Sequence, residues 1–381
     1  MKRVKAIGML TRVSRLCRAF FMSRIYFEVD GIPVEVENLS LKKIINWVLT
    51  EASVFFKPSR PWGFPALIQV EPSNHCNLRC PFCPVTLGMG RPLGHMKLDM
   101  FKEIVDQLRD YLLLILFWDW GEPFLNPDAY EMIRYARQCG IKVIACTNGH
   151  VFASGDHARK VVNSGLDALI FSVDGITEEA YRRYRDQGRL ETVLEGIRKV
   201  VAEKNRLKVK RPIVNFRYIV MRHNERDIGA LKEFACSLGV DMLVLRRFHA
   251  AHSGRQSSAG WESQYAPSEV KYRMPAYSDE DGAPVRAAGN PCRNLWNCPT
   301  IHWDGTVCSC FVDSCEKRPL GALARQQFGD IWKGADFRDL RREFRNHWRQ
   351  LPLCGECAYG FERGDIGRDG DAEVQWLIRH K

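Results

Sequence analysis

The sequence predicts an α/β protein: a partial (β/α)6 barrel of parallel strands, similar to a TIM barrel but open, with a small metal-binding region after it. Two observations predict this architecture. From residue 66 onward, short apolar segments alternate with amphipathic segments of helical periodicity, which is typical of a parallel sheet covered by helices. Ten of the 14 cysteines gather in two places, and 381 residues suffice for a large domain with an appendage.

An N-terminal extension, residues 1–64, precedes the barrel. Residues 25–36 are expected to form a β-hairpin around an Asp30–Gly31 turn, and residues 39–56 an amphipathic helix that ends before a proline-rich break. Residues 1–25 hold seven Lys and Arg and no acid, interleaved with apolar residues near helical spacing. Such a helix suits an anionic membrane surface, a protein partner or a cap on the fold. The net charge is +11, but no nucleic-acid-binding module accompanies it, so no nucleic-acid partner is expected.

The barrel is predicted over residues 65–248, with functional residues at the carboxyl ends of its strands. The expected strands are Leu67–Glu71, Leu113–Trp118, Val143–Thr147, Ala168–Val173, Ile213–Val220 and Met242–Leu245. The expected helices are Asp99–Asp110, Asp128–Gln138, His157–Ser164, Leu190–Asn205 and Glu225–Leu238. Residues 249–290, rich in Ser, Ala, Gly and Pro, are expected to form a linker or a substrate-facing loop. A second domain over 291–362 and a tail over 363–381 complete the predicted organisation.

Three thiols lie within eight residues after the first predicted strand: Cys76, Cys80 and Cys83. This spacing is too tight for an ordinary zinc ribbon, which takes two thiols from each of two places. It suits an iron–sulfur cluster held at three corners, with one iron open to a ligand that the protein does not supply. A structural metal site and buried free cysteines are the alternatives. The CxxxCxxC pattern resembles that of the radical S-adenosylmethionine (SAM) superfamily, in which the open iron of a [4Fe–4S] cluster chelates the amino and carboxylate groups of SAM.

The resemblance implies a set of SAM-binding residues at the strand ends. Residues 120–123 resemble the GGEP segment of the superfamily, with Trp120 in place of the first glycine. The implied cofactor-binding residues are Phe82, Gly121, Glu122, Pro123, Asn148, Ser172, Asp174, Arg185 and Met221. For Phe82 the alternative is plain loop packing, and for Arg185 it is a solvated helix charge. No catalytic side chain is assigned beyond the cluster.

The C-terminal cysteines resemble those of the abbreviated SPASM or twitch domain, which carries an auxiliary [4Fe–4S] cluster. The resemblance implies four ligands: Cys292, Cys310, Cys354 and Cys357. The surplus cysteines of this region are Cys298, Cys308 and Cys315. Cys298 is an alternative ligand to Cys292, and a zinc ion held by four thiolates is the alternative occupant of the site.

The function implied is that of a radical SAM oxidoreductase. SAM is cleaved to methionine and a 5′-deoxyadenosyl radical, which takes a hydrogen atom from a small-molecule or sugar-type substrate, and the auxiliary cluster accepts or relays an electron. A flavodoxin or ferredoxin is the expected electron donor. A ribosomal-peptide maturase is the second hypothesis, and a non-catalytic metal-binding protein the third.

The expected location is the cytoplasm. No signal peptide or membrane-spanning run stands out, and grouped thiols suit a reducing compartment. Peripheral contact with the inner face of the membrane through residues 1–25 is an option within this expectation.

Overall fold

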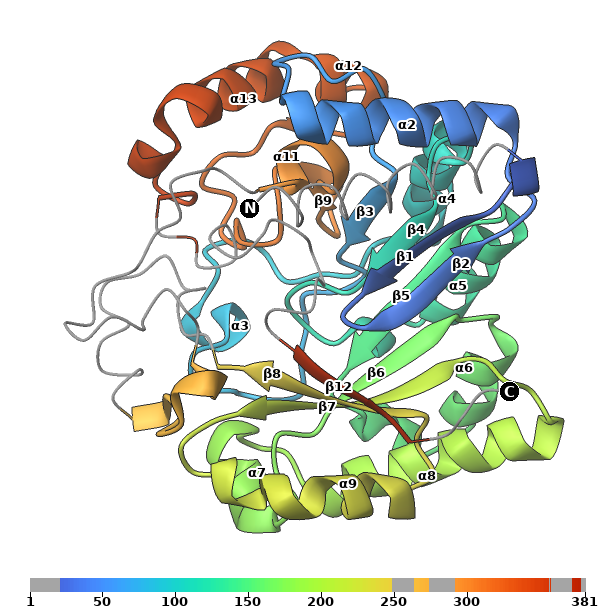
Figure 1. The fold of residues 1–381 in the computed structure, drawn as a ribbon, viewed down its shortest axis with the longest axis vertical. Coiled ribbons are helices and arrows are strands. Elements are labelled where there is room, and N and C mark those ends of the chain that lie inside the picture. The colour runs from blue at the N-terminus through green and yellow to red at the C-terminus, as the bar shows by residue number, and fades with distance from the viewer. Residues whose placement is uncertain (1–20, 249–263, 274–291, 356, 358–371, 378–381) are drawn as a thin grey trace, which may run out of the picture.

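The computed structural model describes residues 21–248, 264–273, 292–355, 357 and 372–377. Its centre is a curved sheet in which six neighbouring strands run parallel and follow the order of the chain (Figure 1). These strands are β3 (Leu67–Val70), β4 (Leu114–Phe117), β5 (Lys142–Thr147), β6 (Ala168–Ser172), β7 (Ile213–Val220) and β8 (Met242–Arg247). The predicted partial barrel is confirmed, and the strand ends lie within two residues of those expected.

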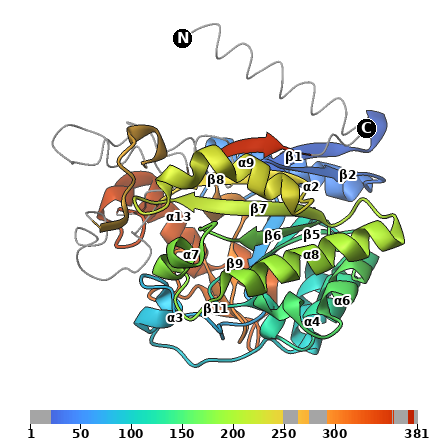
Figure 2. The same cartoon turned by 90° about the horizontal axis from the view of Figure 1, so that it is seen from below.

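Helices cover the outer face of this sheet (Figures 1 and 2). They are α4 (Leu98–Leu108), α5 (Ala129–Gln138), α6 (His157–Asn163), α7 (Glu178–Tyr184), α8 (Leu190–Leu207) and α9 (Ile228–Ser237). Their apolar side chains pack against alternate strand residues such as Ile115 and Phe117, because successive residues of a strand point to opposite faces. The expected helix over 225–238 begins instead with a 3₁₀ turn, η3 (Glu225–Asp227). Helix α7 was not among the expected helices.

The predicted hairpin forms from β1 (Ile25–Val29) and β2 (Ile32–Val36) and lies on the inner face of the sheet (Figure 1). Its apolar side chains pack with those of inner-face residues, among them Ile144, Ala168 and Met242. A Cβ atom on Gly31 would lie 2.3 Å from a methyl carbon of Val374, so the turn needs glycine to approach the sheet this closely. The hairpin therefore fills part of the barrel interior. Helix α2 (Leu41–Phe56) follows it on the outside of the molecule.

The C-terminal region continues the barrel sheet at both edges. Strand β9 (Thr300–Ile301) pairs parallel with β3, and β10 (Thr306–Cys308) and β11 (Gly321–Ala322) follow antiparallel. At the other edge, β12 (Ala372–Trp376) pairs antiparallel with β8. None of these strands was expected, and β12 lies in the predicted tail. The boundaries proposed for the separate domains remain a prediction.

The remaining elements lie in the loops of the barrel and in the C-terminal region. They are α3 (Pro84–Leu87), η1 (Pro123–Leu125), η2 (His150–Ala153), η5 (Val270–Tyr272), α11 (Asn294–Asn297), α12 (Phe328–Lys333), α13 (Ala335–His347) and η7 (Trp348–Gln350). Across the described residues, no helix is both long and apolar enough to cross a bilayer.

Candidate functional site

The three-thiol loop follows β3 and ends at α3, at the carboxyl edge of the parallel strands. Asn74 fixes the start of the loop, because its side-chain amide donates to the Pro92 carbonyl (2.8 Å) and accepts from the Gly94 amide (2.7 Å). A turn closes the end of the loop, where the Cys83 amide donates to the Cys80 carbonyl (3.1 Å). The loop conformation is thus set by hydrogen bonds that leave the thiols to other partners.

N–H groups surround the sulfur atoms of this loop. The Leu78 amide lies 3.4 Å from Cys76 Sγ, and Asn148 Nδ2 lies 3.8 Å from the same sulfur. Arg185 Nη1 lies 3.7 Å from Cys80 Sγ. Burial raises the pKa of Cys76 to about 11 and that of Cys83 to about 12. Donors aimed at buried sulfurs stabilise thiolates, and metal binding releases the thiol protons, so these residues fit a three-cysteine cluster.

Glu122 ties the ends of β4 and β5 together behind this loop. Its carboxylate accepts hydrogen bonds from Thr147 Oγ1 (2.8 Å), the Asn148 amide (2.7 Å) and the Phe124 amide (3.2 Å). Burial raises the pKa of Glu122 to about 7 in spite of these donors. Asn148 in turn donates to Asn77 Oδ1 (2.7 Å) inside the thiol loop. Glu122 and Asn148 are therefore both brought to the loop as expected, and their contact with SAM stays a prediction.

Gly121 lets the β4 loop lie directly on the thiol loop. Its φ is +122°, and a Cβ atom there would lie 2.3 Å from the Ser73 carbonyl oxygen. The next amide, that of Glu122, donates to the His75 carbonyl (2.7 Å). Pro123 is buried and begins η1. Only glycine permits this contact, which explains the residue without any reference to SAM.

Asp174 and Arg185 form a buried pair beside the thiols. Arg185 Nε donates to Asp174 Oδ2 (2.6 Å), and the Ile219 amide donates to Asp174 Oδ1 (2.7 Å). Both side chains are buried, so the solvated-charge alternative for Arg185 is wrong. Both carboxylate oxygens of Asp174 already have partners within the protein. The pair therefore fixes the guanidinium against Cys80.

Phe82 and Met221 lie in one apolar cluster with the thiol loop. The ring of Phe82 stacks on Tyr184 (4.9 Å between centroids) and meets Phe248 and Tyr265 edge-on. Ser172 lies at the end of β6, where its Oγ is 3.4 Å from Cys146 Sγ. Phe82 and Met221 thus lie at the loop, where Phe82 is already packed on these rings, and the contact of Ser172 with SAM stays a prediction.

Three charged residues on the inner face of the barrel sheet were not predicted from the sequence. The carboxylate of Asp30, at the hairpin turn, accepts from Arg246 Nη1 (2.8 Å) and pairs with Arg217. Burial raises the pKa of Asp30, but the two guanidinium groups outweigh it and hold the pKa below its ordinary value. Arg217 Nη1 also lies 3.8 Å from Cys146 Sγ.

The sequence contains a signal for one of these arginines, Arg217. In β7, Asn215 and Arg217 alternate with apolar residues, and an alternating strand has one polar face. Both amide atoms of Asn215 and Nε of Arg217 are buried without a hydrogen-bond partner among the residues that the structure describes. The inner face of β7 is therefore unusually polar for an interior surface.

The four predicted auxiliary ligands come together from three separate segments. Burial raises the pKa of Cys310, and the nearby Cys357, Cys292 and Cys354 thiols raise it further. Cys298 lies beside Cys292 but packs in the apolar core, where burial raises its pKa to about 12. The other surplus cysteines have different neighbours: Cys308 contacts His302 (3.9 Å), and Cys315 contacts Ser314 (3.7 Å). The predicted set is the one that gathers, and its role as cluster ligands stays a prediction.

Within the described residues, no three His, Cys, Asp or Glu side chains converge where a single metal ion would sit. In an iron–sulfur cluster, each cysteine binds a different iron atom. Neighbouring thiols that are buried or half-buried, with N–H donors at the first site, are the donor groups that such clusters bind.

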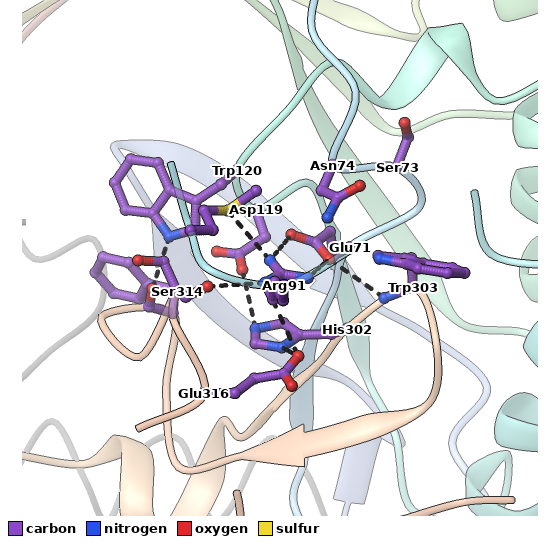
Figure 3. A network of polar contacts seen from close by, with 12 residues as sticks. Glu71, Ser73, Asn74, Arg91, Asp119, Trp120, His302, Trp303, Ser314 and Glu316 are labelled. Atoms are coloured by element: carbon purple, nitrogen blue, oxygen red, sulfur yellow. Dashed lines mark hydrogen bonds and ion pairs between the residues drawn. The ribbon is translucent and has the colours of Figure 1, made fainter. Parts of the chain in front are cut away.

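A buried ionic network joins the barrel to the C-terminal region (Figure 3). Arg91 forms a two-pronged pair with Glu71 at the end of β3 (2.7 and 2.5 Å), and its Nε donates to the Ser314 carbonyl (2.8 Å). The Trp303 amide also donates to Glu71 (3.3 Å). Glu316 lies 3.8 Å from Arg91 and so extends the network.

His302 forms the second half of this network (Figure 3). Its Nδ1 lies 2.8 Å from Glu316, and its Nε2 lies 3.5 Å from Asp119, which follows β4. Burial raises the pKa of Asp119 to about 6. The indole of Trp120 donates to the Phe311 carbonyl (2.8 Å). Trp120, the departure from the GGEP pattern, thus belongs to the contact with the C-terminal region.

Two known sequence families match the chain. Residues 70–235 match the radical SAM superfamily, and residues 292–358 match the SPASM iron–sulfur cluster-binding domain. The AdoMet-dependent heme synthase of Oleidesulfovibrio alaskensis is 28% identical over 325 residues, which cover 78% of this chain and 81% of that protein. The heme synthase of Methanosarcina barkeri is 31% identical over 134 residues, only 38% of its length. The PqqA peptide cyclase of Streptomyces rochei is 25% identical over 48% of each protein.

Two solved structures share the fold. Streptococcus suis SuiB bound to its precursor peptide SuiA superposes with a TM-score of 0.58 at 14% identity, over 93% of this chain and 83% of that one. Native anSMEcpe with bound AdoMet and a peptide superposes with a TM-score of 0.54 at 14% identity, over 80% of this chain and 91% of that one. At this identity the likeness concerns the fold alone.

Proposed function

The chain belongs to the radical SAM superfamily and carries a SPASM domain, and from this premise we propose that it is an oxidoreductase that removes hydrogen from a small-molecule or sugar-type substrate. When bound, SAM and the two clusters supply a 5′-deoxyadenosyl radical that takes the hydrogen atom, and an acceptor for the electron that the substrate then loses. The protein binds, orients and shields the reactants.

Each residue of the first site has a definite task in this proposal. Cys76, Cys80 and Cys83 hold the first cluster. The guanidinium of Arg185, fixed by Asp174, places a positive charge 3.7 Å from Cys80 Sγ and so favours the negative thiolate. Asn148 does the same for Cys76 with a neutral donor. The cluster of rings around Phe82 excludes water on the other side of the loop.

The second site takes up the electron. Cys292, Cys310, Cys354 and Cys357 would hold the auxiliary cluster, which needs thiolates in place of the buried thiols. Lys57 and Arg293 oppose the effect of burial on the pKa of Cys292. These cations ease the release of one thiol proton when metal binds.

The observation that carries the small-substrate proposal is the position of the hairpin. The hairpin packs on the inner face of the sheet and brings Asp30 between Arg217 and Arg246. Arg217 lies in register with Ser172, a predicted SAM-binding residue at the end of β6. Charged groups this close to the predicted SAM-binding residues suit a compact, polar substrate.

A peptide substrate is the second candidate, because residues 25–56 resemble part of a leader-binding module. The burial of the hairpin against Ile144, Ala168 and Met242 speaks against this use, since both of its strands already have an apolar partner surface. Electron supply by a flavodoxin or ferredoxin, and membrane contact through residues 1–25, are further parts of the proposal.

Isotope transfer tests the substrate class. The reconstituted full-length protein would receive dithionite, SAM and an extract of cells grown in deuterated medium, separated into small molecules and polypeptides. We expect 5′-deoxyadenosine that carries one deuterium with the small-molecule fraction alone. Deuterium from the polypeptide fraction alone would overturn the small substrate and favour the peptide maturase. No 5′-deoxyadenosine under any condition would overturn the enzyme proposal.

A further inference from the structure

Helix α2 is amphipathic in the unusual sense: its apolar side faces outward. Leu41 and Phe56 are each 63% exposed, and Ile45 is 45% exposed. With Val48, Leu49, Ala52 and Phe55 they form one stripe, since these positions fall within about a third of a turn at 100° per residue. A surface helix of a globular protein normally turns such a stripe toward the core.

The buried side of α2 combines two apolar side chains, Ile44 and Val54, with polar side chains that are hydrogen-bonded to neighbouring backbone. Asn46 exchanges two hydrogen bonds with Phe64, accepting from its amide (2.8 Å) and donating to its carbonyl (3.1 Å). Thr50 donates to the same carbonyl (2.7 Å), and Ser53 accepts from the Trp62 amide (2.8 Å). These hydrogen bonds fix the orientation of α2. They therefore hold its apolar stripe in an exposed position.

The apolar surface extends beyond α2 at both ends. At its start, the Leu39 amide donates to the Ser23 carbonyl (3.2 Å), which brings Phe21 and Met22, both exposed, beside the first turn. At its other end Trp62 is 49% exposed and packs against Phe56 (5.6 Å between ring centroids). A groove of about 440 Å³ runs beside the stripe, lined by Ile45, Leu49, Trp62, Phe64, Tyr111 and Lys333.

Cations flank this surface. Lys333 and Lys42 both line the groove, and Lys42 also pairs with Asp110 (2.6 Å). Glu51, the one acidic residue in the sequence of α2, is paired with Arg293. The segment that leads into Phe21 is the sequence with seven Lys and Arg and no acid over residues 1–25. Apolar side chains flanked by cations are the chemistry that binds an anionic lipid surface.

We propose that the outer face of α2, together with Phe21, Met22 and Trp62, docks the protein on an anionic lipid bilayer. The apolar stripe enters the boundary between headgroups and acyl chains, while the flanking cations meet the lipid headgroups. This extends the membrane contact proposed for residues 1–25 to a folded surface. A bilayer accounts for both features of the face, a long apolar stripe and a cationic surround.

Vesicle co-sedimentation of the full-length protein tests this proposal. Wild type is expected to sediment with vesicles of phosphatidylglycerol and phosphatidylcholine and to remain in solution with phosphatidylcholine alone. We expect the double variant Ile45→Glu/Phe56→Glu to bind anionic vesicles at least about tenfold more weakly than wild type, because two anchoring side chains become charged. Val209→Glu is the control, since Val209 is also exposed and follows α8, a helix that lies at the opposite end of the molecule from α2 (Figure 1).

Three results would overturn the proposal. Wild type that fails to bind anionic vesicles would exclude a membrane face altogether. A double variant that binds like wild type would assign any binding to residues 1–25 alone. A wild-type dimer that the double variant converts to a monomer, without a change in vesicle binding, would assign the face to contact between copies. Dithionite-dependent SAM cleavage, measured on the same samples, separates these results from a failure of the proposed function.

Discussion

The two groups of thiols are assembled in opposite ways. Cys76, Cys80 and Cys83 lie on one loop between β3 and α3, so local backbone bonds are enough to gather them. The four C-terminal thiols come from three segments that meet only when β10, α13 and the intervening loops are in place. The spacing of the first three thiols is therefore set within one loop, which Asn148 and Arg185 contact from elsewhere in the barrel, while the second site depends on the contact between the C-terminal region and the barrel.

Removal of one thiol from the first site should have the largest effect. We expect Cys80→Ala to abolish dithionite-dependent formation of 5′-deoxyadenosine, because the loop has no fourth cysteine to replace it. Cys236→Ala, at an exposed cysteine, should keep wild-type activity. Liquid chromatography of the anaerobic reaction measures the product. Full activity in Cys80→Ala would show that the cluster lies elsewhere.

The same change at the second site should separate the two clusters. We expect Cys310→Ala to lower the iron content from about eight to about four atoms per chain, with SAM cleavage retained and substrate oxidation lost. Iron and sulfide determination measures the first effect. Cys315→Ala is the control, because Cys315 contacts Ser314 and stands apart from the four gathered thiols. Iron loss in Cys315→Ala instead would assign a different ligand set.

The link between the two regions can be weakened without touching a thiol. We expect Arg91→Met to lower the free energy of unfolding by about 3–5 kcal/mol, because it leaves the fully buried Glu71 carboxylate without its partner. Loss of the exposed Arg318–Glu343 pair by Arg318→Met should cost about 0–1 kcal/mol. Urea unfolding compares the two variants. Equal costs would mean that the network contributes no more than a surface pair.

The pH dependence of stability should show a smaller effect from Glu122. Its pKa is raised from 4.5 to about 7, so the folded chain holds the proton more tightly than the unfolded chain does. Stability is therefore expected to fall as pH rises from about 4.5 to about 7, by roughly 3 kcal/mol at about 1.4 kcal/mol per pKa unit. Glu122→Gln should remove this part of the slope between pH 5 and pH 7.5 in urea titrations. A slope unchanged by the substitution would assign the effect to other groups, such as Asp119.

The barrel and its thiol loop could be predicted from the sequence because their signals are local. Apolar runs such as 168–173 and the CxxxCxxC spacing need no knowledge of the rest of the chain. The strands β9 to β11 have only two or three residues each, too few to show an alternation of apolar and polar residues in the sequence. Their existence depends on β3 as a partner.

Tertiary contacts also decided the roles of charged residues. Arg185 lies after a helical pattern on which a charge is usually solvated, yet Asp174 draws it into the interior. Asp30 looked like an ordinary turn residue, and only the folded barrel brings it to Arg217 and Arg246. In the sequence, Trp120 is only a departure from the GGEP pattern. The structure explains it, because its indole donates a hydrogen bond to the Phe311 carbonyl.

The continuous sheet has a consequence for synthesis on the ribosome. Strand β3 is made early, but the groups that complete its edge, such as the Pro299 and Ile301 carbonyls, follow about 230 residues later. The far edge, at β8, remains unpaired until β12 has been made. Until then the nascent barrel has two open strand edges, which are sites where chains associate wrongly. Chaperones that bind exposed strands should therefore hold this chain until residues 372–376 have been translated.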